Sequence, residues 1–278
     1  MTFLQNYGTI YRGDEMRELF AQYVNAEGMI FKHARGRSVE EGKEFHGYHE
    51  IIYFMEGDAE FITEEFHIDL EPEMLLVIPK ETYHQVIIRG DRENYLRCIV
   101  QFDDTFAQGA FTEKSLGNVV VLPSDREIGS LFEQLIRRAE DENAALLLGA
   151  VLVLLLQKIS ENREIYVSER PRNEVVKQAI SYINRNLNRK ITVEEISNQC
   201  MLSPSALSHI FKREMNIPLH KFIVKKRLIQ AYHKISAGEL PTVAALECGF
   251  NDYSGFYKQY KKMFNAAPSD RSLEFPHS

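Results

Sequence analysis

LSHIFKR (Leu207–Arg213) and FYKQYKK (Phe256–Lys262) begin 49 residues apart and share one pattern. Each stretch has an apolar residue, three variable positions, an aromatic ring and then two cationic side chains. Asn216 and Asn265 follow the two stretches at the same offset. Each stretch comes after a short segment of helical pattern and a turn. Two such helix–turn–helix units within about 100 residues are typical of a chain that enters two successive major grooves on one face of DNA.

Local signals for helix starts support this interpretation. Thr192 begins a capping box, Ser203 stands before a proline at the first helical position, and Asp252 precedes the last amphipathic segment. We therefore expect an all-helical domain over 173–278, with helix–turn–helix units at about 192–214 and 241–264.

The charge is divided unevenly along the chain. The net charge of −7 argues against nucleic acid if it is taken alone. However, residues 172–278 carry 16 Lys and Arg against 9 Asp and Glu, a net +7, which leaves −14 for residues 1–171. Such a split indicates a basic binding domain joined to an acidic domain that does not itself contact phosphate.

Residues 173–272 resemble the DNA-binding domain of the AraC/XylS family of transcriptional regulators. The resemblance is carried by GFNDYSGFYKQYKK (Gly249–Lys262) with Pro268 and Arg271, and by Ser203, Leu207 and Phe211-Lys212 in the first unit. Four positions depart from the family pattern. Asn216 and Asn265 stand where the family usually has glycine, and asparagine tolerates the left-handed conformation that the position requires. Met201 stands at the usual glycine of the first turn, where strain would cost about 1 kcal/mol. Gly255 lies inside the second recognition helix, where we expect it to allow close approach to a base.

In a helix–turn–helix unit, the N-terminal half of the second helix meets the base edges. Helix geometry and the resemblance both give the same outward-facing candidates for base contact: Ser205, Ala206, Ser208, His209, Tyr253, Ser254, Gly255, Tyr257 and Lys258. The candidates for phosphate contact are the cations Lys212, Arg213, Lys261 and Lys262. Lys258 is the best candidate for a guanine contact. The alternative for each of these residues is a solvated helix face.

The N-terminal half has a different pattern. From about residue 26 to residue 102, β-branched and aromatic runs are separated by turn residues, which predicts a small antiparallel barrel or sandwich. Helical patterns follow at about 125–138 and 142–161. We expect an α+β protein of two domains. They are a ligand-sensing and dimerisation domain (1–161), a linker (162–172) and the DNA-binding domain (173–278).

Two short motifs in the first domain resemble those of the cupin fold. Glu44-Phe45-His46-Gly47-Tyr48-His49-Glu50 with Gly57 resembles the first cupin motif, and Glu73, Pro79, Glu81 and His84 fall on the second. The resemblance places Glu44, His46, Glu50 and His84 at that fold's four metal positions. Because sensor cupins of regulators bind small molecules, we expect these residues to bind an effector, together with Tyr48, Tyr53, Phe31 and His33. A divalent metal on the same four residues is the alternative, and otherwise no cofactor is expected.

The helix expected at 142–161 is apolar almost all round, so it must be covered on several sides. It packs in the core, or forms a subunit interface flanked by the helix at 125–138. Its longest apolar run, 144–156, is too short to span a bilayer, and the first residues lack a signal-peptide pattern. We therefore expect a cytoplasmic homodimer.

The leading hypothesis is a ligand-responsive, sequence-specific regulator without enzymatic activity. Its partners would be a double-stranded operator, a small effector such as a sugar, and RNA polymerase if it is an activator. A metal-dependent cupin enzyme with a regulatory tail, and a regulator whose barrel only dimerises, are the alternatives.

Overall fold

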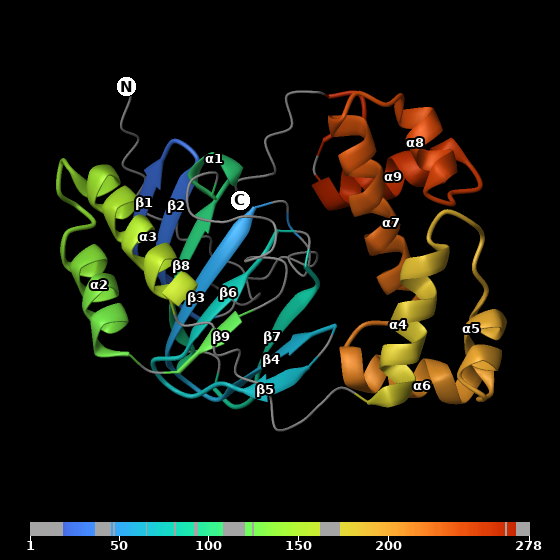
Figure 1. Cartoon of the computed structure of the whole chain (residues 1–278), viewed down its shortest axis with the longest axis horizontal. Coiled ribbons are helices and arrows are strands. Elements are labelled where there is room, and N and C mark those ends of the chain that lie inside the picture. The colour runs from blue at the N-terminus through green and yellow to red at the C-terminus, as the bar shows by residue number, and fades with distance from the viewer. Residues whose placement is uncertain are drawn as a thin grey trace. The chain divides into compact units, whose positions relative to one another are not determined.

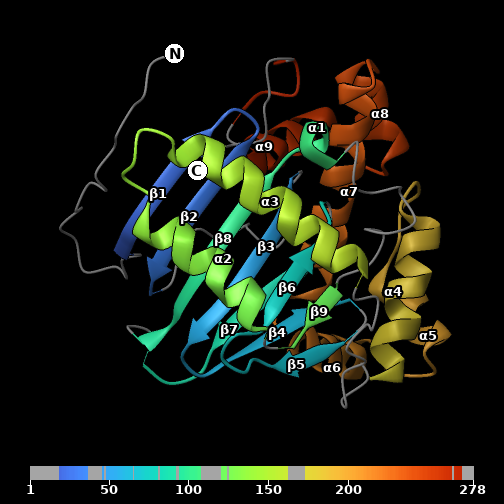
Figure 2. The ribbon, with the colours of Figure 1, turned by 60° about the vertical axis from the view of Figure 1, so that its left-hand side comes forward.

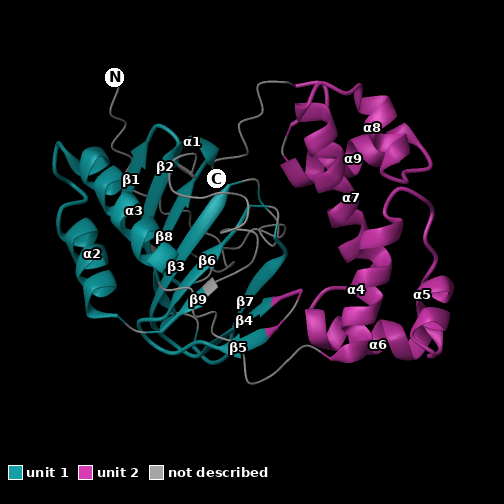
Figure 3. Cartoon of the chain, viewed as in Figure 1, with its two compact units in different colours: residues 1–62, 67–169 teal, residues 63–66, 170–278 magenta. Residues whose placement is uncertain are grey.

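A computed structural model describes residues 19–36, 46, 48–64, 66–80, 82–91, 94–107, 120–123, 125–161, 173–264 and 266–270. The chain divides into two compact units, residues 1–62 with 67–169 and residues 63–66 with 170–278 (Figure 3). The first unit is rich in β-structure and the second is helical, which confirms the predicted fold class. The predicted linker lies outside the described residues.

The first unit contains two antiparallel sheets. The six-stranded sheet has the order β1 (Leu19–Ala26), β2 (Met29–Arg35), β8 (Leu96–Phe102), β3 (His49–Glu56), β6 (Leu75–Ile78) and β9 (Val120–Leu122). The three-stranded sheet has the order β5 (His67–Asp69), β4 (Ala59–Thr63) and β7 (His84–Ile88). A short helix, α1 (Asp104–Ala107), follows β8.

The central strand β3 is buried on both faces. Ile51 and Tyr53 belong to the hydrophobic core that contains the following helices, whereas Glu50 pairs in register with Gln101 of β8 on the opposite face. Successive side chains of a strand point to opposite faces, so alternate residues of β3 serve two environments. One face packs on helices, and the other carries polar residues that include Glu50 and Gln101.

Helices α2 (Arg126–Arg137) and α3 (Ala144–Glu161) cross one face of the six-stranded sheet (Figure 1 and Figure 2). Asp125 caps α2 by accepting a hydrogen bond from the backbone N–H of Glu127 at 2.7 Å. Ile128, Phe132 and Leu135 form its buried stripe.

Within the described residues, α3 is the helix long and apolar enough to cross a membrane, since the 13-residue apolar run is part of an 18-residue helix. This is weak evidence, because the core helix of a globular domain has the same composition. The buried side of α3, including Leu148, Leu152 and Leu155, joins the core against the sheet.

The second unit consists of α4 (Glu174–Asn186), α5 (Val193–Gln199), α6 (Pro204–Met215), α7 (Leu219–Ser236), α8 (Pro241–Glu247) and α9 (Tyr253–Phe264). Helices α5 and α6 form one helix–turn–helix, α8 and α9 form the other, and α7 connects them. The predicted capping box is present: Thr192 accepts from the Glu195 N–H at 3.1 Å, and Glu195 accepts from the Thr192 N–H at 3.0 Å. Ser203 caps α6, with Pro204 at its first position.

The turns of the two units differ in backbone strain. Met201 in the first turn has a φ of 54° and is 89% exposed, which agrees with the strain expected at this position. Gly249 in the second has a φ of 77°, and a β-carbon there would lie 2.8 Å from the Leu187 carbonyl oxygen. Arg227 of α7 donates to the same carbonyl at 3.2 Å and also to that of Arg189. Thus Gly249 fits where no side chain could.

We predict that Gly249→Ala destabilises the protein more than Gly238→Ala. Both glycines have positive φ, but nothing lies within 4 Å of a β-carbon at Gly238. Gly238→Ala should therefore cost only the left-handed backbone, about 1–2 kcal/mol, whereas Gly249→Ala adds a clash with fixed backbone. Chemical denaturation of the full chain measures both. Equal losses would show that the close approach at Gly249 is relieved at no cost.

Candidate nucleic-acid interface and ligand site

The first half of α6 offers small polar side chains. Ser205, Ser208 and His209 are exposed and Ala206 is half-buried, while Leu207 and Phe211 face the core. The Ser208 hydroxyl donates to the Pro204 carbonyl at 2.8 Å, so a base contact by this hydroxyl competes with that hydrogen bond.

The start of α9 is organised by Asp252. Its carboxylate accepts from the Gly255 N–H at 2.6 Å. A β-carbon at Gly255 would lie 3.0 Å from that carboxylate. The space that the Asp252 carboxylate occupies therefore explains why a glycine stands at position 255. The close approach to a base, which the sequence predicts, is a second reason for this glycine. Tyr253, Ser254 and Lys258 are exposed, and Tyr257 is half-buried.

The cations at the ends of α6 and α9 differ in their pairing. Lys212, Lys261 and Lys262 are exposed and form no ion pair with any described residue, and the same holds for Lys258. Arg213 instead pairs with Glu214, with Nη2 and Oε1 2.9 Å apart. Unpaired cations are free to meet phosphate without breaking an existing contact.

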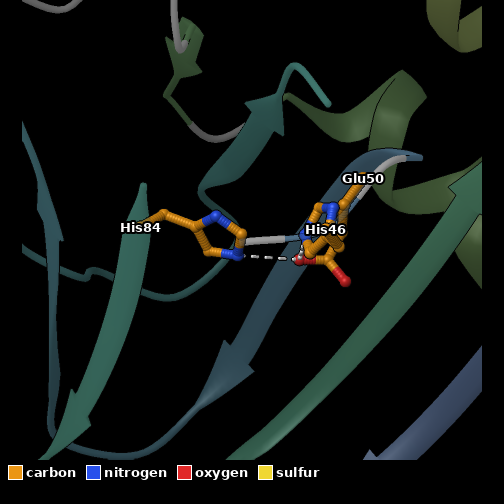
Figure 4. Close-up of side chains that lie close together, drawn as sticks. All are labelled: His46, Glu50 and His84. Carbon is orange, nitrogen blue, oxygen red and sulfur yellow. Dashed lines mark ion pairs between the residues drawn. The ribbon is translucent and has the colours of Figure 1, made fainter. Parts of the chain in front are cut away.

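A buried polar cluster lies in the first unit (Figure 4). His46, Glu50 and His84 are 4%, 6% and 5% exposed. Glu50 Oε2 lies 3.4 Å from His46 Nε2 and 3.3 Å from His84 Nε2. Glu50 comes from β3 of one sheet and His84 from β7 of the other, so the two sheets bring together residues that are far apart in sequence.

Surrounding contacts orient these groups. The other ring nitrogen of each histidine, Nδ1, bonds a backbone carbonyl: that of Tyr48 at 2.8 Å for His46 and that of Thr82 at 3.0 Å for His84. Gln101 donates to Glu50 Oε1 at 2.8 Å and to the Tyr48 hydroxyl at 3.1 Å. The Tyr48 ring stacks on that of His46.

Burial and mutual proximity shift the pKa values within the cluster. Burial would raise the pKa of Glu50, but the adjacent His46 and His84 hold it well below its ordinary value. Burial lowers the pKa of His46, and this outweighs the opposing effect of Glu50.

The structure does not bring all predicted ligand residues together. Tyr53 and His33 lie in register with Cys98 on the helix-facing side of the sheet, opposite Glu50. Tyr53 stacks on Phe132 of α2 at 4.6 Å, and burial raises its pKa to about 12. Phe31 belongs to the same helix-facing core. These three are therefore separated from the cluster by the sheet, and Glu44 and Glu81 lie outside the described residues.

Lys32 and Gln101 are buried polar residues on the Glu50 face that were not predicted. Lys32 of β2 is 3% exposed, and Gln101 of β8 links Glu50 to Tyr48. Strand alternation places Lys32 on the face opposite its neighbours Phe31 and His33, but the register of β2 with β8 decides which face that is. No motif marks either residue.

Comparison with known proteins identifies the family. Residues 28–156 match the AraC-like ligand binding domain, and residues 196–271 match a helix-turn-helix domain. The chain belongs to the AraC family of transcriptional regulators. This AraC-family member thus has an N-terminal ligand-binding domain and a C-terminal DNA-binding domain, as its resemblance implied.

Individual relatives share 27% or less of their aligned residues with this chain in the three comparisons that follow. This AraC-family chain is 24% identical over 238 residues to the HTH-type transcriptional activator RhaS of Mannheimia succiniciproducens, covering 81% of this chain and 87% of that one. It is 27% identical over 148 residues to the arabinose operon regulatory protein of Escherichia coli, covering 50% and 49%. The crystal structure of ToxT from Vibrio cholerae O395 aligns over 91% of this chain and 100% of its own, with 12% identity and a TM-score of 0.40.

Proposed function

We propose that this regulator reads its operator with the exposed N-terminal halves of α6 and α9. The observation that carries the proposal is a pair of capped helices. Each presents polar side chains at its start and, near its end, at least one lysine that forms no ion pair with the described residues. Base contacts come from the exposed residues of both helices, and phosphate contacts from Lys212, Arg213, Lys261 and Lys262. Phosphate contacts position the protein, whereas base contacts select the sequence.

Lys258 and Lys261 provide a matched test, because both are exposed lysines of α9 without an ion pair among described residues. Lys258→Ala should cost about 1–3 kcal/mol at one base position and relax the preference there. Lys261→Ala should weaken binding to all sequences and reduce the salt slope by about one. The operator is first selected from random duplexes, and affinities are then measured by gel shift at several salt concentrations.

Lys234→Ala is the control, because this lysine of α7 is already paired with Glu239 and Glu247, so its removal should change neither property. Absence of any salt-sensitive, sequence-preferring binding by the wild type would refute the DNA-reading role. A uniform loss in Lys258→Ala across all sequences would refute its base contact.

We further propose that α3 forms a homodimer interface. The apolar side chains Leu146, Val153 and Leu154 are 75%, 55% and 46% exposed on the side of α3 that faces away from the core. The exposed positions of the adjacent α2 are polar or charged, including Arg126, Glu133 and Gln134. An apolar strip with a polar border is the composition of a subunit interface.

Leu154→Lys is expected to shift the protein from dimer to monomer and to weaken binding to a two-site operator while sparing single-site binding. A lysine placed in the apolar strip cannot be buried without a partner. Sedimentation velocity measures the change, with Gln134→Lys on the polar face of α2 as control. A dimer unaffected by Leu154→Lys would exclude this interface.

The effector of this regulator is proposed to be a small polyhydroxylated molecule such as a sugar, bound on the Glu50 face of the six-stranded sheet. Glu50, His84, Gln101 and Tyr48 supply donors and acceptors of the kind that bind hydroxyl groups. Binding would alter regulation through differential affinity for two states of the protein, with RNA polymerase as a further partner if the protein activates. We expect it to act without enzymatic activity, in the cytoplasm.

A thermal-shift screen of sugars and other metabolites tests the effector class. A ligand at 100 times its dissociation constant should stabilise the protein by about 2.7 kcal/mol. Gln101→Ala should reduce the shift, whereas His33→Gln on the opposite face should not. Stabilisation only by ligands without hydroxyl groups would exclude a sugar, and no stabilisation by any compound would favour a purely dimerising domain.

A further inference from the structure

The two recognition helices carry different side chains at their starts. At the 49-residue offset of the repeat, Pro204 and Ser208 of α6 stand where α9 has Tyr253 and Tyr257. The buried positions of the two helices are apolar in both, so the difference lies on the outward side. Because the helices repeat one pattern, the pair of tyrosines belongs to the second unit alone and is not required by the fold that the units share.

The two tyrosine rings form one surface on α9. Tyr253 is 39% exposed and Tyr257 is half-buried, and their ring centroids are 6.3 Å apart. Residues four apart are neighbours on one face of a helix. The centroid of the Tyr253 ring also lies 5.7 Å from that of Phe256, which is fully buried. Contact with the core therefore orients this surface before any ligand binds.

The same helix carries exposed cations beside the rings. Lys261 lies one turn beyond Tyr257 on the same face, and Lys258 follows Tyr257 directly. Neither lysine forms an ion pair with a described residue. An apolar surface next to such cations fits a polyanion that also presents apolar groups. At the base edges of the major groove, that group is the C5-methyl of thymine. A 5-methylcytosine presents the same methyl group at the same ring position.

We propose that Tyr253 and Tyr257 bind the 5-methyl groups of pyrimidines in the part of the operator that α9 contacts. This inference rests on the proposed function, because it requires α9 to lie in the major groove. Four residues span about 6 Å along a helix and base pairs are about 3.4 Å apart, so the rings reach methyl groups up to about two base steps apart. Operator affinity therefore responds to cytosine methylation at these positions as well as to base sequence.

Single replacements of thymine by uracil test the proposal, because uracil lacks only the methyl group. Full-length protein is titrated by gel shift against the selected operator, with each thymine near the base position of Lys258 replaced in turn. Loss of one methyl contact should weaken binding about fourfold, the equivalent of about 0.8 kcal/mol for one buried aliphatic carbon. At the same position, 5-methylcytosine should bind about fourfold more tightly than cytosine.

Variants assign the methyl contact to the rings. Tyr257→Ser gives α9 the residue type of the equivalent position in α6, and it should bring the ratio of thymine to uracil affinity at its contact close to one. Tyr257→Phe should keep the ratio of the wild type, because the ring makes the contact and the hydroxyl does not. Each ratio compares two duplexes with one protein preparation, so a variant that is partly unfolded still reports it correctly.

Three outcomes overturn the inference. Wild-type protein that binds its operator but binds thymine and uracil duplexes equally at every position makes no methyl contact, and the proposed function stands. A ratio that is unchanged in both Tyr253→Ser and Tyr257→Ser assigns the methyl contact to another residue, such as Ala206 of α6. Absence of sequence-preferring binding by the wild type refutes the proposed function and this inference together.

Discussion

The helical unit depends on the contact between Arg227 and two backbone carbonyls. Arg227 comes from α7, the helix shared by both helix–turn–helix units, and it binds the oxygens of Leu187 and Arg189 beyond the end of α4. Gly249, in the turn of the second unit, packs against the same atoms. One guanidinium therefore joins the connecting helix, the approach to the first unit and the turn of the second. These contacts are made to backbone atoms, so they link the segments that carry both recognition helices.

Much of this unit could be predicted from the sequence, because its signals are local. Thr192, Ser203 and Asp252 stand immediately before the helices that they cap, and a cap requires only residues within one turn. Gly255 shows the limit of such an argument. Its position suggested contact with DNA, but the crowding of the Asp252 carboxylate became visible only with the side chains in place.

The ligand site was less predictable, because sheets are assembled from distant segments. The motif correctly brought His46, Glu50 and His84 together. Tyr53 could have been excluded from the sequence, since an odd separation from Glu50 along one strand places it on the opposite face. His33 could not have been, because its face depends on the register of β2 with β8. Lys32 and Gln101 also required that register, which no local pattern specifies.

The two-sided burial of β3 has a mechanical consequence. Glu50 on one face and Tyr53 on the other are three residues apart on the same strand, and Tyr53 stacks directly on Phe132 of α2. A close-packed interior transmits small displacements instead of absorbing them. A ligand bound at the Glu50 carboxylate would therefore lie only one strand away from helix α2. A displacement caused by the ligand would reach this helix through β3 itself, without a long chain of side-chain contacts.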